Sequence, residues 1–392
     1  MERIGIYGGA FSPPHVGHMR AAEYALGQLR LSKLLLIPSG TSPHKILPPH
    51  SPTPQQRLEM LQLAAGENME VSDLEIARGG ISYTYMTVDQ LKEIYPQQEL
   101  VLLMGTDMFL SFLTWKEPER IIGKASLGVF YRGESREAEQ ILQQKKVMEA
   151  MGATVYLVEN PVTHISSTQI RRMLTFHCGS EFLPDGVETY IRTNGLYNTG
   201  EDLRNLPMDK LEQVVVSLLK PNRVAHVLGC RDTAAELARR WGADETDAAR
   251  AGLLHDITKA LDGPLQLTLC RDYGMVLDGF FENNPKTLHA LTGSLVAERI
   301  FGENKAVVDA IASHTTGKPN MNLLEKIIYV ADYMEPNRDF PGVETLRHMA
   351  YTDLDQALKL GLTMTLDLLK EQGREISPES AQALAYLEQT GV

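Results

Sequence analysis

Residues 4–18 read IGIYGGAFSPPHVGH, and this stretch decides the fold of the first half of the chain. Its apolar start, residues 4–7, predicts a buried strand that passes directly into Gly8 and Gly9. Glycine lets a backbone approach a ligand closely at the carboxyl end of a strand, where open α/β sheets bind their ligands. We expect a helix to begin near Gly17, with unpaired amides and a positive dipole end that favour a phosphate.

Two histidines, His15 and His18, stand where this expected helix begins. Imidazole N–H groups can donate hydrogen bonds to phosphate oxygens, more strongly as negative charge builds in a transition state. A glycine pair with two histidines also fits an ordinary turn with surface histidines. The strand before it, the HVGH spacing and the helix after it together favour the phosphate site.

Strand and helix patterns alternate outward from this stretch. Short apolar runs predict further strands at residues 34–37, 100–104, 127–131 and 155–158. Helical patterns lie between them, at residues 55–65, 84–94, 107–115, 137–151 and 166–174. The alternation predicts an α/β fold, a Rossmann-like doubly wound parallel sheet.

The strand pattern stops near residue 197. Residues 198–207 are polar and interrupted by glycine and proline, which favours a linker. Beyond them only helical spacing follows, at residues 208–219, 224–241, 247–261, 288–301, 303–314, 323–334 and 353–372. We therefore expect an α/β domain over residues 1–197, a linker over 198–207 and an all-α domain over 208–392.

Composition sets limits on the class of protein. The 392 residues exceed what one hydrophobic core usually serves, and the net charge of −12 argues against binding to nucleic acid, which needs a basic face. Cys178, Cys230 and Cys270 show no Cys-x-x-Cys spacing, so neither a disulfide scaffold nor a zinc knuckle is indicated. No apolar run approaches the roughly 18–20 residues that span a bilayer. We expect a reduced, cytoplasmic protein without a nucleic-acid or membrane partner.

The first half resembles a known enzyme superfamily. HVGH, residues 15–18, is similar to the HxGH signature of the nucleotidyltransferases, and ISSTQIR, residues 165–171, resembles their ISSTxIR motif. The second motif is itself a helix start rich in hydroxyls, with Arg171 one turn in, which suits the β- and γ-phosphates of ATP. The resemblance implies a nucleotide site formed by Gly8, Gly9, Phe11, Ser166, Ser167 and Thr168.

Within that superfamily the chain is similar to the nicotinate-nucleotide adenylyltransferases, which join nicotinate mononucleotide to AMP from ATP. The resemblance implies that Lys45, in PHK at 43–45, contacts a phosphate, and that helix-start amides at Thr84 and Tyr85 hold the nicotinate carboxylate. It also implies that Asp107 binds a ribose or adenosine hydroxyl and that Trp115 stacks on the pyridine ring. A tryptophan alone is more often a core residue.

The reaction implied is in-line attack by the mononucleotide phosphate on the α-phosphorus of ATP. Catalysis is then positioning and charge neutralisation, by His15, His18, Lys45, Arg171 and Mg²⁺. Arg132 is a weaker phosphate candidate, and Ser12, where the family usually has Asp or Asn, receives no role. A transferase with another acceptor, such as phosphopantetheine or a cytidylyl acceptor, remains an alternative.

The second half carries an ordered set of histidines and aspartates: His226, His255, Asp256, His289, His314 and Asp332. We expect Asp256 and Asp332 to lie on buried helical stretches, and a buried bare carboxylate is costly without a cation. No lysine or arginine neighbours Asp332 on the apolar face, so convergence on metal ions is the simplest solution. Any one of these histidines alone is more often a core or surface residue.

This set resembles the HD-domain phosphohydrolases. HTTG at residues 314–317 and YVADYMEPNR at 329–338 are similar to the bacterial HD family that cleaves diadenosine tetraphosphate symmetrically into two ADP. The resemblance implies one metal held by His226, His255, Asp256 and Asp332, and a second held by His289, His314 and the bridging Asp256. Such a pair lowers the pKa of a bridging water for attack on an inner phosphorus.

Metal identity stays open at this point. The mixed donors suit iron, manganese, zinc or cobalt, and the family suggests iron. Lys259 is either a phosphate contact or an ordinary exposed lysine, and Arg223 and Arg338 are weaker phosphate candidates.

The sequence thus predicts a bifunctional enzyme that uses ATP, nicotinate mononucleotide and diadenosine tetraphosphate. A regulatory nucleotide-binding module, or a hydrolase for another phosphate ester, remains an alternative for the second half. The choice between nicotinate and nicotinamide mononucleotide, coupling of the halves and the oligomeric state are left open.

Overall fold

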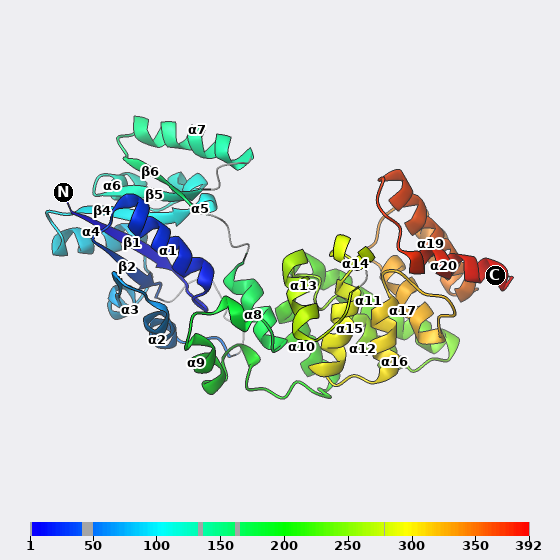
Figure 1. The fold of residues 1–392 in the computed structure, drawn as a ribbon. Helices are drawn as coiled ribbons and strands as arrows, with labels where there is room; N and C mark the ends of the chain where they lie inside the picture. The colour runs from blue at the N-terminus through cyan, green and yellow to red at the C-terminus, as the bar shows by residue number, and fades with distance from the viewer. Residues whose placement is uncertain (1, 41–49, 132–135, 161–164, 278, 392) are drawn as a thin grey trace. The chain divides into compact units, whose positions relative to one another are not determined.

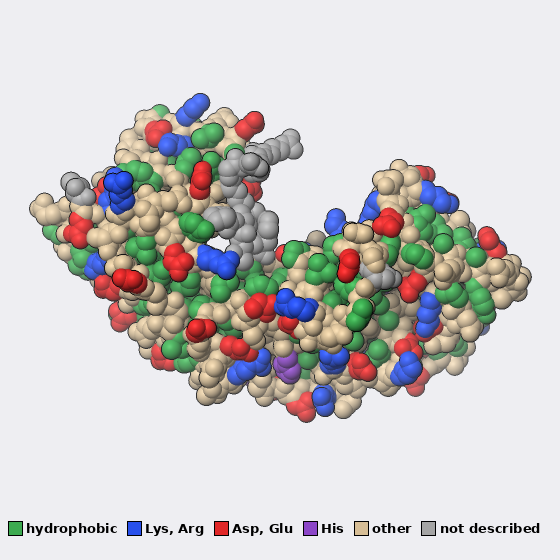
Figure 2. Space-filling view, in the orientation of Figure 1, with side chains coloured by type: hydrophobic (Ala, Val, Ile, Leu, Met, Phe, Trp, Pro, Cys, Tyr) green, Lys and Arg blue, Asp and Glu red, His purple; other side chains and the backbone are tan. Residues whose placement is uncertain are grey.

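The structure is a computed structural model that describes residues 2–40, 50–131, 136–160, 165–277 and 279–391. The chain forms two compact units, Met1–Glu201 and Asp202–Val392 (Figure 1). On the face drawn in Figure 2, acidic and basic side chains are interspersed over both units. None of the described helices is long and apolar enough to cross a membrane.

The first unit is built on a parallel sheet, as expected. Its described strands are β1 (Arg3–Gly9), β2 (Lys33–Pro38), β3 (Met69–Val71), β4 (Glu99–Gly105), β5 (Ala125–Tyr131) and β6 (Val155–Glu159). Their order is β3-β2-β1-β4-β5-β6, so strand order reverses between β1 and β4. Strand β3 was not predicted, because three residues around a charged Glu70 leave no apolar run to detect.

Helices cover both faces of this sheet (Figure 1). Along β4, Leu100 and Leu102 enter one core cluster, and the alternating Val101 and Leu103 enter the other. Burial on both faces explains why the strands read as continuous apolar runs.

The described helices of the first unit are α1 (Val16–Leu29), α2 (Pro54–Ala64), α3 (Leu74–Arg78), α4 (Thr84–Ile94), α5 (Thr106–Leu110), α6 (Pro118–Ile122), α7 (Arg136–Ala150), α8 (Ser167–Thr175) and α9 (Val187–Thr193). The expected single helix over 107–115 was wrong: α5 ends at Leu110 and a 3₁₀ turn follows over Phe112–Thr114. The Ser111 hydroxyl donates to the Asp107 carbonyl at 2.8 Å, and such side-chain bonds compete with helix continuation.

The second unit is all-α in its described residues, as expected. Its helices are α10 (Met208–Leu218), α11 (Pro221–Trp241), α12 (Glu245–Leu254), α13 (Gly263–Asp272), α14 (Gly279–Asn283), α15 (His289–Arg299), α16 (Lys305–Ser313), α17 (Leu323–Met334), α18 (Val343–Ala350), α19 (Leu354–Glu371) and α20 (Pro378–Gln389). The prediction of a helix through residue 261 was wrong, because α12 ends at Leu254 and tight turns follow. In those turns Ile257 N–H bonds to the Leu254 carbonyl at 3.0 Å, and the Thr258 hydroxyl bonds to the His289 carbonyl at 3.0 Å.

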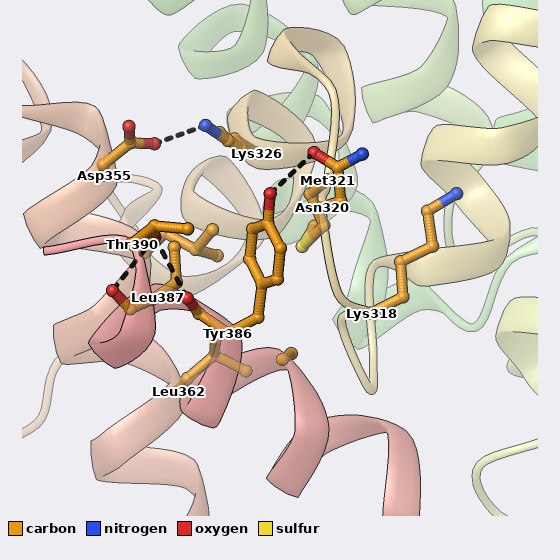
Figure 3. Close-up of a pocket in the computed structure, with 11 residues that line it drawn as sticks. Lys318, Asn320, Met321, Lys326, Asp355, Leu362, Tyr386, Leu387 and Thr390 are labelled. Carbon is orange, nitrogen blue, oxygen red and sulfur yellow. Dashed lines mark hydrogen bonds and ion pairs between the residues drawn. The ribbon is translucent and has the colours of Figure 1, made fainter. Parts of the chain in front are cut away.

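A cavity of about 280 Å³ lies between α17, α19 and α20 (Figure 3). The Tyr386 hydroxyl, on α20, donates to Asn320 Oδ1 at 3.1 Å, and Lys326 Nζ lies 2.6 Å from Asp355 Oδ1 (Figure 3). The Tyr386 bond therefore ties α20 to the turn before α17, and the Lys326–Asp355 ion pair joins α17 to α19.

Candidate functional sites

The first candidate site lies where strand order reverses, between the carboxyl ends of β1 and β4. A cavity of about 680 Å³ opens there. Ligands of open α/β sheets bind at this kind of switch point. Residues far apart in the sequence line it, among them His15, His18, Asp107, Ser166 and Ser167.

His15 and His18 hold each other in one orientation. His15 precedes the first residue of α1, and its Nδ1 accepts from the His18 backbone N–H at 3.3 Å. His18 Nδ1 accepts in turn from the His15 backbone N–H at 3.2 Å. Because both Nδ1 atoms accept, the proton of each neutral ring lies on Nε2, which is left as a hydrogen-bond donor.

Burial keeps both rings neutral. His15 is 5% exposed, and its pKa is lowered to about 2 by burial and then by the neighbouring His18. Burial also lowers the pKa of His18 to about 4. Both rings therefore enter the site as neutral hydrogen-bond donors rather than as cations.

The start of α8 is fastened to the turn that follows β1. Ser166 caps α8 by accepting from the Gln169 amide at 3.3 Å, and the Ser167 hydroxyl donates to the Pro13 carbonyl at 3.0 Å. Arg171 donates to the Ser12 carbonyl at 2.7 Å and to the Thr168 hydroxyl at 3.0 Å. The segments 15–18 and 165–171, which are 150 positions apart in the chain, therefore meet at one edge of the sheet.

Several other expected residues lie around this cavity rather than in its lining. Gly8 and Gly9 end β1, and Phe11 is 1% exposed, packed under His18 with ring centroids 5.0 Å apart. The Phe11 side chain thus supports His18. Lys45 and Arg132 lie outside the described residues.

Two of the expected acceptor residues, Thr84 and Tyr85, lie at the start of α4. Thr84 is its first residue, and no side chain caps this helix end. Tyr85 and Trp115 both pack against the sheet core while remaining partly exposed. Arg120 lies over the Tyr85 ring at 5.1 Å, which brings a cation to this aromatic surface.

The second candidate site is a cluster that five segments of the helical unit build together. His226 comes from α11, His255 and Asp256 from the turn after α12, His289 from the start of α15, His314 from the end of α16, and Asp332 from α17. Nε2 of His226 lies 3.1 Å from Asp332 Oδ1 and 3.3 Å from Nε2 of His255. Nε2 of His289 and Nε2 of His314 lie 3.4 and 3.8 Å from Asp256 Oδ1. The structure therefore brings all six residues together.

Hydrogen bonds on the far side of each ring decide which nitrogen faces the cluster. Nδ1 of His255 lies 2.7 Å from the Gly252 carbonyl oxygen. Nδ1 of His289 lies 2.8 Å from that of Lys286, and Nδ1 of His314 lies 2.7 Å from that of Ile311. Carbonyls only accept, so each Nδ1 carries the proton and each Nε2 presents a lone pair. In His226 the partner of Nδ1 is the fully buried Glu335 carboxylate, whose Oε1 lies 3.1 Å away. Its Nε2 therefore also faces the cluster with a lone pair.

This donor set fits divalent metal ions. Two lone pairs that face each other at 3.3 Å, as in His226 and His255, repel unless a cation lies between them. Burial lowers the pKa of His314 to about 4 and holds that of His255 well below its usual range, so these rings do not supply the positive charge themselves. The possible ligand atoms form two groups, and within each group they all lie within 4.8 Å of one another. The first group is His226, His255 and Asp332, and the second is His255, Asp256 and His314.

The expectation that Asp332 lies on a buried face without a neighbouring cation was wrong. Arg338, just beyond the end of α17, donates to Asp332 Oδ1 at 2.6 Å, and Arg223 contacts Asp256. Asp332 is also partly exposed, and Asp256 lies in a turn rather than on a helix. The histidine geometry, not an unpaired carboxylate, carries the inference of a metal.

Lys259 reaches the edge of the cluster. Its Nζ lies 2.8 Å from Nε2 of His289 and 3.9 Å from Asp256 Oδ1. The Thr315 hydroxyl lies 3.2 Å from Nε2 of both His289 and His314. Sequence reasoning missed Thr315 and Glu335, although both stand inside the motifs quoted for this half.

Geometry defines a two-unit protein: a Rossmann-like unit with a phosphate-type site at its switch point, and a helical unit with a candidate divalent-metal centre. Comparison with known families agrees with this division. The cytidylyltransferase-like model matches residues 6–173, and the HD domain model matches residues 223–337.

Named relatives match each half separately. A "Probable nicotinate-nucleotide adenylyltransferase" of Desulfitobacterium hafniense is 39% identical over 203 residues, which is 50% of this chain and 96% of that protein. A "Bis(5'-nucleosyl)-tetraphosphatase, symmetrical" of Halalkalibacterium halodurans is 41% identical over 172 residues, 44% of this chain and 91% of that protein.

A solved structure from Clostridium acetobutylicum, described as a predicted HD superfamily hydrolase involved in NAD metabolism, is 38% identical. The match covers 47% of this chain and 98% of that chain, with a TM-score of 0.46. The chain belongs to the cytidylyltransferase-like family in its first half and to the HD-domain family in its second.

Proposed function

We propose that the chain catalyses two reactions. The first unit transfers AMP from ATP to nicotinate mononucleotide, giving deamido-NAD and pyrophosphate. The second unit hydrolyses diadenosine tetraphosphate symmetrically to two ADP. The named relatives of each half support this pairing of activities.

The adenylyl transfer needs positioning and charge neutralisation, because the acceptor phosphate is itself the nucleophile. Its oxygen attacks the α-phosphorus, and the bond to the bridging oxygen of the β-phosphate breaks. The Nε2–H groups of His15 and His18 donate to phosphoryl oxygens as charge builds on them. Backbone amides at the start of α8 bind the β- and γ-phosphates of the ATP–Mg²⁺ complex. Arg171 holds that helix end in place through its bond to the Ser12 carbonyl.

One observation carries this assignment: the reciprocal bonds of His15 and His18 leave both Nε2–H donors at a cavity shared with the start of α8. The test is chromatography of products after the whole chain is incubated with ATP, Mg²⁺ and nicotinate mononucleotide. We expect deamido-NAD, with a loss of at least a hundredfold in His18→Ala and little change in Arg20→Ala, an exposed residue on the same helix. In parallel incubations, turnover of phosphopantetheine with ATP, or of a cytidylyl acceptor with CTP, in place of deamido-NAD formation would reject the proposed acceptor.

In the second unit, six residues would hold two divalent ions, with Asp256 shared between them: His226, His255, Asp256, His289, His314 and Asp332. Such ions supply Lewis acidity to phosphoryl oxygens and lower the pKa of a water. Lys259, 3.9 Å from Asp256, and Arg223 place positive charge beside the bound tetraphosphate. The buried carbonyl and Glu335 contacts keep each imidazole proton on Nδ1, so Nε2 stays available as a ligand.

The test of the second activity pairs product identification with metal analysis. The whole chain, supplied with Fe²⁺ or Mn²⁺, is expected to bind about two ions per chain and to release ADP as sole product. His255→Ala should lose metal and hydrolysis together, and His348→Ala, an exposed histidine of the same unit, should lose neither. Bound metal without any hydrolysis by the parent chain would favour a nucleotide-binding regulatory module.

A further inference from the structure

Tyr197 is a buried tyrosine with no assigned role in either candidate site. It is 5% exposed, and its ring belongs to a hydrophobic cluster built from α2, α8 and α9. Its hydroxyl lies 3.0 Å from the Ser12 hydroxyl, 185 positions earlier in the chain. Burial raises the pKa of Tyr197, so this hydroxyl keeps its proton at neutral pH. A core position therefore carries one hydrogen-bonding group to the turn after β1.

The backbone of Tyr197 is held in an uncommon conformation. Its φ of 56° and ψ of 39° lie in the left-handed region, which residues other than glycine adopt rarely and at a cost. The Tyr197 N–H donates to the His50 carbonyl at 2.9 Å, and the Tyr197 carbonyl accepts from the Thr175 hydroxyl at 3.2 Å. Backbone strain of this kind persists where the surrounding contacts determine the geometry, and it concentrates at functional sites.

Ser12 occupies a sensitive place in the turn that leads to the two histidines of the first site. Phe11 precedes it and packs under the His18 ring, with centroids 5.0 Å apart. Two prolines follow it and lead directly to His15. Because proline fixes φ, few torsion angles between Ser12 and His15 can absorb a displacement. A shift of Ser12 is therefore passed on to both histidines.

Three other described side chains contact this turn, and all of them contact its backbone. Arg57, Arg171 and Ser167 donate to carbonyl oxygens of the turn at 2.8, 2.7 and 3.0 Å. Of these four contacts, the bond between Ser12 and Tyr197 alone joins two side chains. It is thus the one contact that a pair of conservative substitutions can remove while the other three stay in place.

We propose that Tyr197 and Ser12 are positioning residues for adenylyl transfer, because the bond between their hydroxyls fixes the turn that aims the histidine Nε2–H donors at the reacting phosphate. This inference rests on the proposed transferase function. Neither residue is among the described residues that line the switch-point cavity, so both act through the histidines. Arg171 and Ser167 still fasten the start of α8 to the turn when the bond is lost. The chemical step should therefore suffer more than the binding of ATP.

A double-mutant cycle on the whole chain tests this division. Tyr197→Phe removes the hydroxyl and keeps the ring in its cluster, and Ser12→Ala removes the partner. Each is expected to lower kcat for deamido-NAD formation about tenfold, and to change the KM for ATP by less than about twofold, as the loss of one hydrogen bond allows. The double variant should be no slower than either single variant, because all three remove the same bond. Tyr190→Phe, which removes a hydroxyl bonded to Glu59 in the same unit, is the control and should keep the parental kcat.

Hydrogen–deuterium exchange tests the same contact without relying on turnover. The backbone amides of His15 and His18 each donate to Nδ1 of the other histidine, so their exchange reports how firmly the two rings are held. Tyr197→Phe is expected to speed exchange of these two amides about tenfold, and Tyr190→Phe should leave it unchanged.

The possible results separate the positioning role from the transferase assignment. Unchanged kcat or unchanged exchange in Tyr197→Phe would overturn the role, and so would additive losses in the double variant. A loss of kcat shared by Tyr190→Phe would attribute the effect to general stability and would also overturn it. Faster exchange in Tyr197→Phe, in a chain whose parent makes no deamido-NAD, would keep the contact as the support of the histidines and reject the transferase assignment.

Discussion

Gly17 shows how one missing side chain shapes the first site. A Cβ at this position would lie 3.0 Å from Nδ1 and 3.1 Å from Cε1 of His15. We expect Gly17→Ala to displace the His15 ring and to lower adenylyl transfer at least tenfold, at a stability cost of about 1–3 kcal/mol from overpacking. Gly27→Ala, in the same helix with open space around its Cβ, is the control and should retain full activity. Equal rates for both variants would contradict the importance of the ring position.

Glu335 makes the corresponding contribution in the second site. Removing its charge weakens the anchor on Nδ1 of His226, and such partners of metal ligands typically affect affinity 10–100-fold. We therefore expect Glu335→Gln to lose metal affinity in this range, as measured by competition with a chromogenic chelator. Glu344→Gln, with a side chain 81% exposed, is the control. Unchanged affinity in a folded Glu335→Gln variant would show that the contact has no such role.

The difference between these two residues also shows what a sequence can predict. Gly17 lies inside a local motif, so its position at the start of a helix could be expected from the sequence, whereas its close approach to His15 is seen in the structure. Glu335 acts through a contact with a residue 109 positions earlier in the chain, and no local pattern reports that distance. The same limit explains Arg338, whose pairing with Asp332 depends on how the chain turns after the helix ends.

Helices and strands were predictable where the apolar period is long. The predictions failed where side chains compete with the backbone for hydrogen bonds. Helix α17 matches its predicted range of 323–334, because a capping box begins it and a continuous apolar face follows. The turn after α12 was predicted as helix because its apolar residues continue the pattern. The helix instead ends at Leu254, and in the turns that follow the Thr258 hydroxyl bonds to the distant His289 carbonyl. That failure falls on the segment that carries His255 and Asp256.

The cap of α8 provides a prediction at this scale. Ser166→Ala removes the hydroxyl that accepts from the backbone N–H of Gln169, at a cost of about 1 kcal/mol in stability. Because this helix end is proposed to hold ATP phosphates, the KM for ATP should rise about fivefold, the equivalent of 1 kcal/mol. Thr53→Ala removes the comparable cap of α2 and should lower stability alike while leaving this KM unchanged. An equal rise in the KM for ATP in both variants would mean that lost stability, and not a lost phosphate site, causes the rise.

At the scale of the whole molecule, each unit has its own core and its own candidate site, so metal removal should separate the two proposed activities. Chelation followed by dialysis and return of Mg²⁺ alone should restore adenylyl transfer, which needs only Mg²⁺ with ATP, and leave tetraphosphate hydrolysis lost until Fe²⁺ or Mn²⁺ is added. Calorimetry should show one unfolding transition moving to lower temperature on chelation, since ions at a hundredfold excess over their Kd stabilise a native state by about 2.7 kcal/mol. His255→Ala is the control, because its transition should no longer respond to chelator. A shift of every transition in the parent chain would instead mean that the metal centre stabilises both units together.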